Sequence, residues 1–143
     1  SDRGCVLMVN LIEVQEGIWK AISKINKYAV VDYIEFDSID PPFIRLGNLY
    51  FDDNSVKNND CIKAQQYINI YSTYSGKKEI LEMMDEVNKA METLEIEGHQ
   101  VRIKRGHQSL SLAKDQLGSI HLRMDKNNNK FYRAVLVFDI YIY

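Results

Sequence analysis

Three histidines, His99, His107 and His121, are the side chains best suited to acid–base or metal chemistry in this sequence. Neutral imidazole is a common ligand for zinc and other transition metals, so three histidines that converge in the fold could hold an ion. Their spacing is wider than in the usual zinc motifs, and each falls on or beside a strand pattern, which equally favours polar side chains facing water. No metal and no cofactor is therefore predicted.

Motifs for catalysis are absent from the sequence. We find no G-x-S-x-G, H-E-x-x-H, P-loop or G-x-G-x-x-G pattern, and the glycines are scattered singly. No catalytic residue is predicted, and we expect a protein that is not an enzyme.

A basic cluster on one predicted strand could contact phosphate groups: Arg102, Lys104 and Arg105. Alternating charges are also typical of the exposed face of a sheet. Eighteen Lys and Arg against twenty Asp and Glu give 18 − 20 = −2, so the chain has no overall positive field to attract nucleic acid. A small metal-binding or nucleic-acid-binding protein stays open as an alternative function.

An acidic, amide-rich segment follows the first predicted strand. It lacks the central glycine and the distal glutamate of a calcium-binding EF-hand loop, so a solvated hairpin tip is the simpler interpretation. We predict that it is an interaction loop. Its polar residues are Asp52, Asp53, Asn54, Asn58, Asn59 and Asp60.

Tyrosines on the predicted strands stand out as candidate contact residues. Tyrosine favours interfaces because it buries a large area at a small entropic cost and keeps a polar tip. Ordinary β-propensity explains part of the pattern. We predict that four outward-facing tyrosines line a contact between subunits: Tyr67, Tyr71, Tyr141 and Tyr143.

Two helices and about five strands must position these side chains. Apolar residues at three- and four-residue spacing predict amphipathic helices over residues 11–27 and 75–94, the second with Ser75 as N-cap. Two-residue alternation predicts strands, and the last of them belongs in the middle of the sheet or under a partner because it is apolar on both faces. These strands cover residues 43–51, 61–73, 99–107, 119–125 and 132–142.

The strand boundaries depend on a few special residues. Pro41 and Pro42 fix where the first strand begins, and Gly47 marks a bulge within it. Residues 28–40 form either a short strand or an ordered loop, and Leu110 and Leu112 could extend a strand. The predicted order is α-β-β-α-β-β-β, an α+β fold with an antiparallel sheet and both helices on one face.

The chain of 143 residues is long enough for one hydrophobic core. We predict a single domain over residues 11–143 and a leader or tag remnant over residues 1–10. No signal peptide is evident, and no apolar stretch approaches the roughly 20 residues that span a bilayer, so no membrane contact is expected. Cys5 and Cys61 are too far apart for a disulfide framework, which fits synthesis in a reducing compartment.

Several segments together resemble the tail completion or tail terminator proteins of long-tailed bacteriophages and gene transfer agents. They are "PPFIRLGNLYFDDNS", "IKAQQYINIYSTYSGKKEILEMMDEVNKAMETL", "GHQVRIKRG" and the pair "GSIHLRMD" and "KFYRAVLVFDIYI". The similarity covers residues 18–143 and runs through structural rather than catalytic positions.

This resemblance implies a structural protein of a phage or prophage that forms a ring, commonly a hexamer. The ring would cap the tail tube protein and join it to the head connector or stopper protein, and DNA would pass through it without specific binding. The protein would be made in the bacterial host cytoplasm and end in the neck of the virion. Another neck component, such as a head-closure protein, is the alternative. The segment 52–60 matches the family's variable loop, and we expect it to project toward the channel or the next ring.

Overall fold

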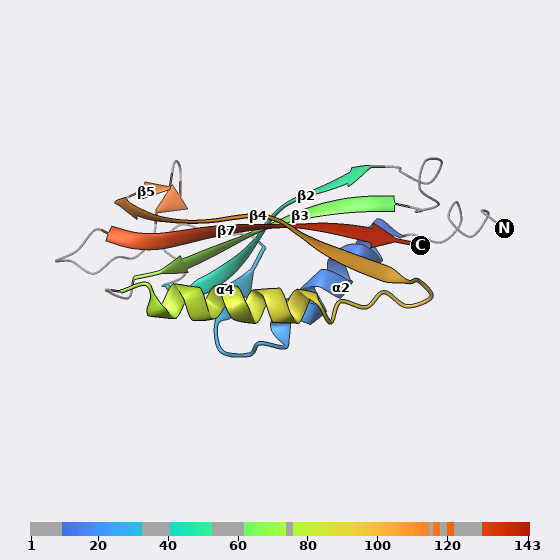
Figure 1. Cartoon of the computed structure of the whole chain (residues 1–143), viewed down its shortest axis with the longest axis horizontal. Helices are drawn as coiled ribbons and strands as arrows, with labels where there is room; N and C mark the ends of the chain where they lie inside the picture. Colours follow the sequence, from blue (N-terminus) through green and yellow to red (C-terminus); the bar gives the residue numbers. More distant parts are fainter. Residues whose placement is uncertain are drawn as a thin grey trace.

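Both helices lie on one face of a five-stranded sheet (Figure 1). The computed structural model describes residues 10–32, 41–52, 62–73, 76–114, 116–117, 120–121 and 130–143. Within these ranges no helix covers the opposite sheet face, which we call the open face. The expected α+β class, with two helices and five strands in the sheet, is confirmed.

The sheet has the strand order β1-β2-β3-β7-β4, and a separate pair is formed by β5 and β6. Neighbouring strands in the main sheet are antiparallel except β1 and β2, which are parallel. The elements are α2 (Leu11–Ser23), β1 (Ala29–Val31), β2 (Phe43–Asp52), β3 (Ile62–Ser72), α4 (Lys78–Met91), β4 (Val101–Lys114), β5 (Gln116–Leu117), β6 (Ile120–His121) and β7 (Lys130–Ile142).

The element order differs from the prediction at two places. First, β1 adds a strand before β2 and pairs with it in parallel, so the sheet is not wholly antiparallel. A strand of three residues is too short to display a two-residue period, which is why the pattern left this segment open. Second, the strand predicted at residues 119–125 supplies only β6 in the described chain, and β6 pairs with β5 instead of the main sheet.

Helix α2 begins where the sequence pattern predicts. The Asn10 side chain accepts a hydrogen bond from the backbone N–H of Ile12 at 2.9 Å, which satisfies one of the free donors at the helix start. Its buried stripe is Val14, Gly17, Ile18, Ala21 and Ile22. A Cβ on Gly17 would lie 3.0 Å from the carbonyl oxygen of Glu95, so the missing side chain permits this close approach.

Helix α4 begins later than predicted, because its N-cap is Lys77 and not Ser75. Its first turn is tied to the end of β3, where the Ser72 hydroxyl donates to the Glu79 carboxylate at 2.5 Å. The two helices contact each other, and Lys27 and Glu86 form an ion pair at 2.9 Å. The hydrogen bond and the negative charge of Glu86 raise the pKa of Lys27.

The hairpin of β2 and β3 follows the prediction, with β2 beginning directly after Pro42. The register shifts between Leu46 and Leu49, which confirms the bulge expected at Gly47. Gln66 is 2% exposed, and its side-chain Nε2 donates to the carbonyl oxygens of Gly47 (3.1 Å) and Asn48 (3.3 Å). The buried amide therefore satisfies carbonyl groups that the bulge takes out of the ladder.

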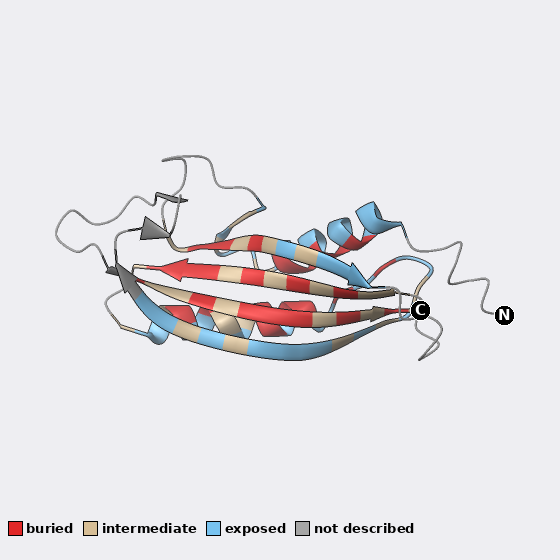
Figure 2. Ribbon diagram, turned by 90° about the horizontal axis from the view of Figure 1, so that it is seen from above, coloured by how far each residue is buried: buried red, intermediate tan, exposed pale blue. Residues whose placement is uncertain are grey.

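Strand β7 lies between β3 and β4, as its apolar character predicted. Five of its residues that face the helices are fully buried in the core: Ala134, Leu136, Phe138, Ile140 and Ile142. Figure 2 shows buried residues recurring along β3 and β7, whereas β4 is exposed along most of its length. The core thus sits between the central strands and the helices, and β4 forms a thin outer border.

Candidate interaction surfaces at the sheet edges

The histidines do not form a metal site in the described chain. His99 Nδ1 lies 2.8 Å from the carbonyl oxygen of Tyr143, and His107 is exposed on β4. The side chain of His121 lies outside the described residues. No group of three His, Cys, Asp or Glu side chains that could hold an ion occurs in the described ranges.

Only the first residue of the predicted interaction loop is described. Asp52 is exposed at the end of β2 and lies opposite Lys63 of β3. Asp53, Asn54, Asn58, Asn59 and Asp60 lie outside the described residues. A shallow hollow opens beside Asp52, lined by Tyr50, Phe51, Asp52, Lys63 and Gln65.

The prediction that Tyr71 faces outward is wrong. Tyr71 is 2% exposed, because its ring packs against Phe43 at 4.7 Å and Phe131 at 6.4 Å between centroids. Burial of the phenol raises the pKa of Tyr71. Alternation along β3 correctly predicted the sheet face on which Tyr71 lies, but it could not show that β2 and β7 bring two further rings to the same place.

The other three candidate tyrosines are half-buried, and two of their rings already have partners in their own chain. Tyr141 lies under two cations, with the Arg102 guanidinium carbon 4.5 Å and the Lys63 ammonium 5.7 Å from the ring centroid. Tyr67 packs edge-on against Tyr50 at 5.8 Å.

Tyr143 extends the pairing of β7 with β4 by one residue, because its backbone N–H donates to the carbonyl oxygen of Gln100 at 3.0 Å. The role of Tyr67, Tyr71, Tyr141 and Tyr143 in a subunit contact stays a prediction. Tyr50 was missed, although it is 53% exposed. Carrying the Gly47 bulge through the alternation would have placed Tyr50 on the open face, opposite Gln65.

One lateral border of the molecule is the outer edge of β4, which we call the β4 edge. β4 pairs with β7 on one side, and the described chain places no strand on its other side. Its register shifts between Arg105 and Gln108, where a Cβ on Gly106 would lie 3.1 Å from the Val137 carbonyl oxygen. Within the described chain, this 14-residue strand is therefore an edge strand of the sheet, the kind of strand on which another chain can pair.

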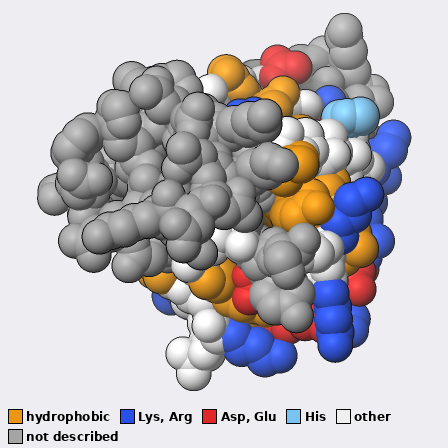
Figure 3. All heavy atoms as spheres, turned by 90° about the vertical axis from the view of Figure 1, so that its left-hand side faces the viewer, with side chains coloured by type: hydrophobic (Ala, Val, Ile, Leu, Met, Phe, Trp, Pro, Cys, Tyr) orange, Lys and Arg blue, Asp and Glu red, His pale blue; other side chains and the backbone are white. Residues whose placement is uncertain are grey.

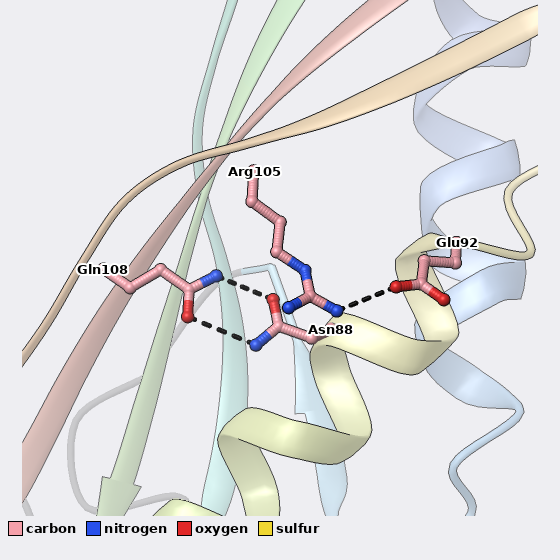
Figure 4. A network of polar contacts seen from close by, with 4 residues as sticks. All are labelled: Asn88, Glu92, Arg105 and Gln108. Atoms are coloured by element: carbon pink, nitrogen blue, oxygen red, sulfur yellow. Dashed lines mark hydrogen bonds and ion pairs between the residues drawn. The ribbon is translucent and has the colours of Figure 1, made fainter.

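Helix α4 supports the β4 edge from below through two polar contacts (Figure 4). Asn88 and Gln108 exchange two side-chain hydrogen bonds, of 3.2 Å from Asn88 and 2.7 Å from Gln108. Arg105 donates to the Glu92 carboxylate at 2.8 Å. Asn88 is 7% exposed, so its amide pair is protected from water, whereas Arg105 and Glu92 are both more than half exposed.

Two exposed leucines lie on the β4 side of the molecule. Leu112 is 53% exposed and, like Gln108, faces the helix layer; Leu81 is 47% exposed and lies two turns before Asn88 in α4. Leu112 lies four residues, about 13 Å, past Gln108 along β4. Leu81 lies seven residues, about 10 Å, before Asn88 along α4, so both leucines lie on the same side of the Asn88–Gln108 pair. Figure 3 looks onto the end at which α4 begins, where hydrophobic side chains lie beside Lys and Arg.

The opposite border is the outer edge of β2, which we call the β2 edge. β1 pairs only with Phe43 to Arg45, so the described chain leaves residues 46–52 without a strand on that side. Helix α2 reaches beyond this side of the sheet (Figure 2). The exposed apolar residues of α2 are Leu11, Ile12 and Trp19, and Phe51 is exposed on β2 itself.

The two borders carry opposite charges at matching positions. Cross-strand register places Asp52, Lys63, Tyr141 and Arg102 in one row across the sheet. Arg102, Lys104 and Arg105 are exposed on β4, whereas residues 46–52 of β2 carry only the charge of Asp52. The row therefore begins with a carboxylate at the β2 edge and ends with a guanidinium at the β4 edge.

Neither helix in the described ranges is long and apolar enough to cross a membrane.

Comparison with known proteins gives a fold but no sequence family. No protein-family model and no curated protein sequence matches the chain. Among solved structures, 23 chains match, one of them in the virion of a native gene transfer agent particle. That chain superimposes with a TM-score of 0.61 at 15% sequence identity, over 90% of this chain and 93% of the other. The protein therefore shares its fold, over nearly its whole length, with a chain of a gene transfer agent virion.

Proposed function

We propose that the protein is a structural, non-enzymatic component of a phage-type particle. More specifically, we propose a tail completion or tail terminator protein that forms a ring, caps the tail tube and joins it to the head. The observation that carries this proposal is the fold shared with a gene transfer agent virion chain over 90% of the sequence. Proteins that share a fold at such low sequence identity can have different roles, so the proposed role as a tail terminator rests on the surfaces of the subunit.

The two borders of the sheet support assembly into a ring. A closed ring of identical subunits needs two different surfaces that complement each other, one on each side of the subunit. The β4 edge is basic and is covered by no other strand of the described chain, and the β2 edge ends in the exposed residues Phe51 and Asp52. The subunit thus carries the unlike borders that head-to-tail closure requires, with a hexamer as the expected size.

The segment that begins at Asp52 would point toward the channel or the next ring, with Asp52 itself, the last residue of β2, at the subunit border. Acidic side chains in a channel would repel the DNA backbone and let it slide without sticking. Replacing Asp52, Asp53 and Asp60 with lysine should impair particle assembly or DNA passage. Normal titres of infectious particles with all three replacements would contradict this role.

Electron microscopy of the protein mixed with purified tail tubes tests the proposed function directly. We expect an annulus at one end of each tube and no tube elongation beyond it. A head-closure protein would instead bind heads and leave bare tubes unchanged, so the order of addition separates the two neck roles. A protein that stays dispersed with both tubes and heads would overturn the proposal.

A further inference from the structure

We propose that residues 46–52, the part of β2 not paired with β1, form an antiparallel β-ladder with β4 of a second copy of this chain. The second copy thereby continues the five-stranded sheet from one subunit into the next. The inference deepens the proposed function and rests on it for its biological role, but the pairing itself is a property of the two sheet edges.

Strand direction favours this pairing. β2 is antiparallel to β3, β3 to β7, and β7 to β4, so β2 and β4 run in opposite directions within one subunit. In a ring every copy points the same way along the axis, so β4 of one copy meets β2 of the next in antiparallel orientation. Antiparallel ladders have straighter hydrogen bonds than parallel ladders and are slightly more stable per residue.

Charge also favours a second copy as the occupant. Asp52 and Arg102 lie in one row, as do Tyr50 and Lys104, so copies at equal height bring unlike groups together. The carboxylate would meet the guanidinium, and the Tyr50 ring would meet the ammonium of Lys104. Pairing of β4 with another β4 around these positions would instead bring Arg102 and Lys104 of two copies together on the open face, and like charges across a ladder are destabilising.

The apolar side chains beside each edge fit the same arrangement. Phe51 is 37% exposed and faces the helix layer, in one row with Ala64, Ile140 and Ile103. At equal height Phe51 would pack beside Ile103 of the second copy and extend the core across the boundary. The ladder would therefore remove apolar area from water as well as satisfy backbone groups.

Disulfide cross-linking tests the pairing. In a chain with Cys5→Ser and Cys61→Ser, Asp52→Cys is combined in turn with Arg102→Cys, Lys104→Cys or Ser109→Cys, and each variant is oxidised both free at high concentration and bound to purified tail tubes. Facing residues in an antiparallel ladder bring Cβ atoms within disulfide range. We expect a ladder of covalent oligomers beyond the dimer with at least one β4 position.

Single-cysteine variants are the matched controls. Asp52→Cys alone and each β4 cysteine alone should stay monomeric on a non-reducing gel, because head-to-tail pairing never places a residue beside its own copy. Covalent dimers from one β4 cysteine would indicate two-fold β4 pairing and overturn the inference. The inference is equally overturned if no oligomer ladder forms in either state.

A charge exchange gives a second readout. Asp52→Lys should weaken self-association at least about tenfold, and adding Arg102→Glu should restore much of the loss. Far-UV circular dichroism checks that both variants fold, since Arg102 also contacts Tyr141.

Failure of the inference and failure of the proposed function give different results. An annulus on tail tubes without a β2–β4 cross-link keeps the function and removes the pairing. The converse, a β2–β4 ladder in a protein that binds neither tubes nor heads, keeps the pairing and removes the function.

Discussion

The two borders of this sheet are built differently. The β4 edge is a long strand that leaves most of its side chains in water and is held from below by α4 through Asn88 and Gln108. The β2 edge is covered by β1 only at residues 43–45, and Gln66 donates hydrogen bonds to the carbonyl groups at its bulge. One border is thus supported by a helix and the other by its own neighbouring strand.

This difference shows why one sheet can offer two complementary surfaces. A protein with like borders would associate through a two-fold axis and stop at a dimer, whereas unlike borders direct growth head to tail until a ring closes. The polar contacts that support each border from within the subunit should then contribute to the stability of the monomer. The side chains exposed at each border should contribute to assembly. Four sets of substitutions separate these contributions.

The largest effect on stability is expected at the β2 edge. Gln66→Ala removes a buried donor from the carbonyl oxygens of Gly47 and Asn48, and unsatisfied buried polar groups destabilise by about 1–3 kcal/mol. Urea unfolding should show a lower midpoint with an unchanged slope. Gln65→Ala is the matched control, because Gln65 is half-buried on the open face, bonds only Asp139 in the described chain and should change stability much less. Equal losses for both variants would contradict the assigned role of Gln66.

The β4 edge should respond next to loss of the buried amide pair. Asn88→Ala leaves the Gln108 amide without its partner and should destabilise the fold by about 1–2 kcal/mol. A double-mutant cycle with Gln108→Ala measures the coupling between the two amides, which should be favourable. A coupling energy near zero would mean that α4 does not support β4 through this pair.

The ion pair between Arg105 and Glu92 should contribute less to stability than the Asn88–Gln108 pair. Arg105 and Glu92 are more than half exposed, and such pairs typically contribute less than about 1 kcal/mol. Glu92→Gln should lower the urea midpoint only slightly, and the difference from the unmodified protein should shrink in 1 M salt, where charges are screened. A loss as large as that of Asn88→Ala would reverse the assigned order of the two contacts.

The smallest effect on stability is expected from exposed apolar residues at the borders. Leu112→Gln and Ile12→Gln replace side chains that are 53% and 64% exposed, so unfolding should change by less than about 0.5 kcal/mol. Light scattering should nevertheless show weaker self-association if these residues belong to contact surfaces. Unchanged association with both replacements would remove the apolar side chains from the assembly surface and leave the strand edges alone.

Sequence patterns predicted those elements that are long and bury one face. α2, α4, β2, β3 and β7 each repeat their period several times, so their positions are correct to within a few residues. β1 and the part of β4 after His107 were left open between strand and loop, because the first has three residues and the second buries little. A strand that is exposed on both faces does not need alternating apolar and polar residues, so its sequence resembles that of a loop.

The candidate contact residues were predicted less well, for a different reason. Alternation gives the side of a strand on which a residue points, but exposure depends on what other segments bring to that side. Tyr71 is buried by Phe43 and Phe131, and Tyr50 reaches the open face only because the bulge at Gly47 shifts the alternation. Gln66 was likewise not predicted as a core residue, because its side chain is buried to donate hydrogen bonds to carbonyl groups of a neighbouring strand.

The sequence by itself determined the α+β class, the two amphipathic helices and the central position of β7, because hydrophobic periodicity depends on neighbours along the chain. Only the tertiary structure decided which strands lie at the borders and which charges face outward there. Strand order is set by contacts between segments far apart in sequence, and no local pattern encodes them. The unlike β2 and β4 edges, on which the proposed assembly depends, belong to that second kind of information.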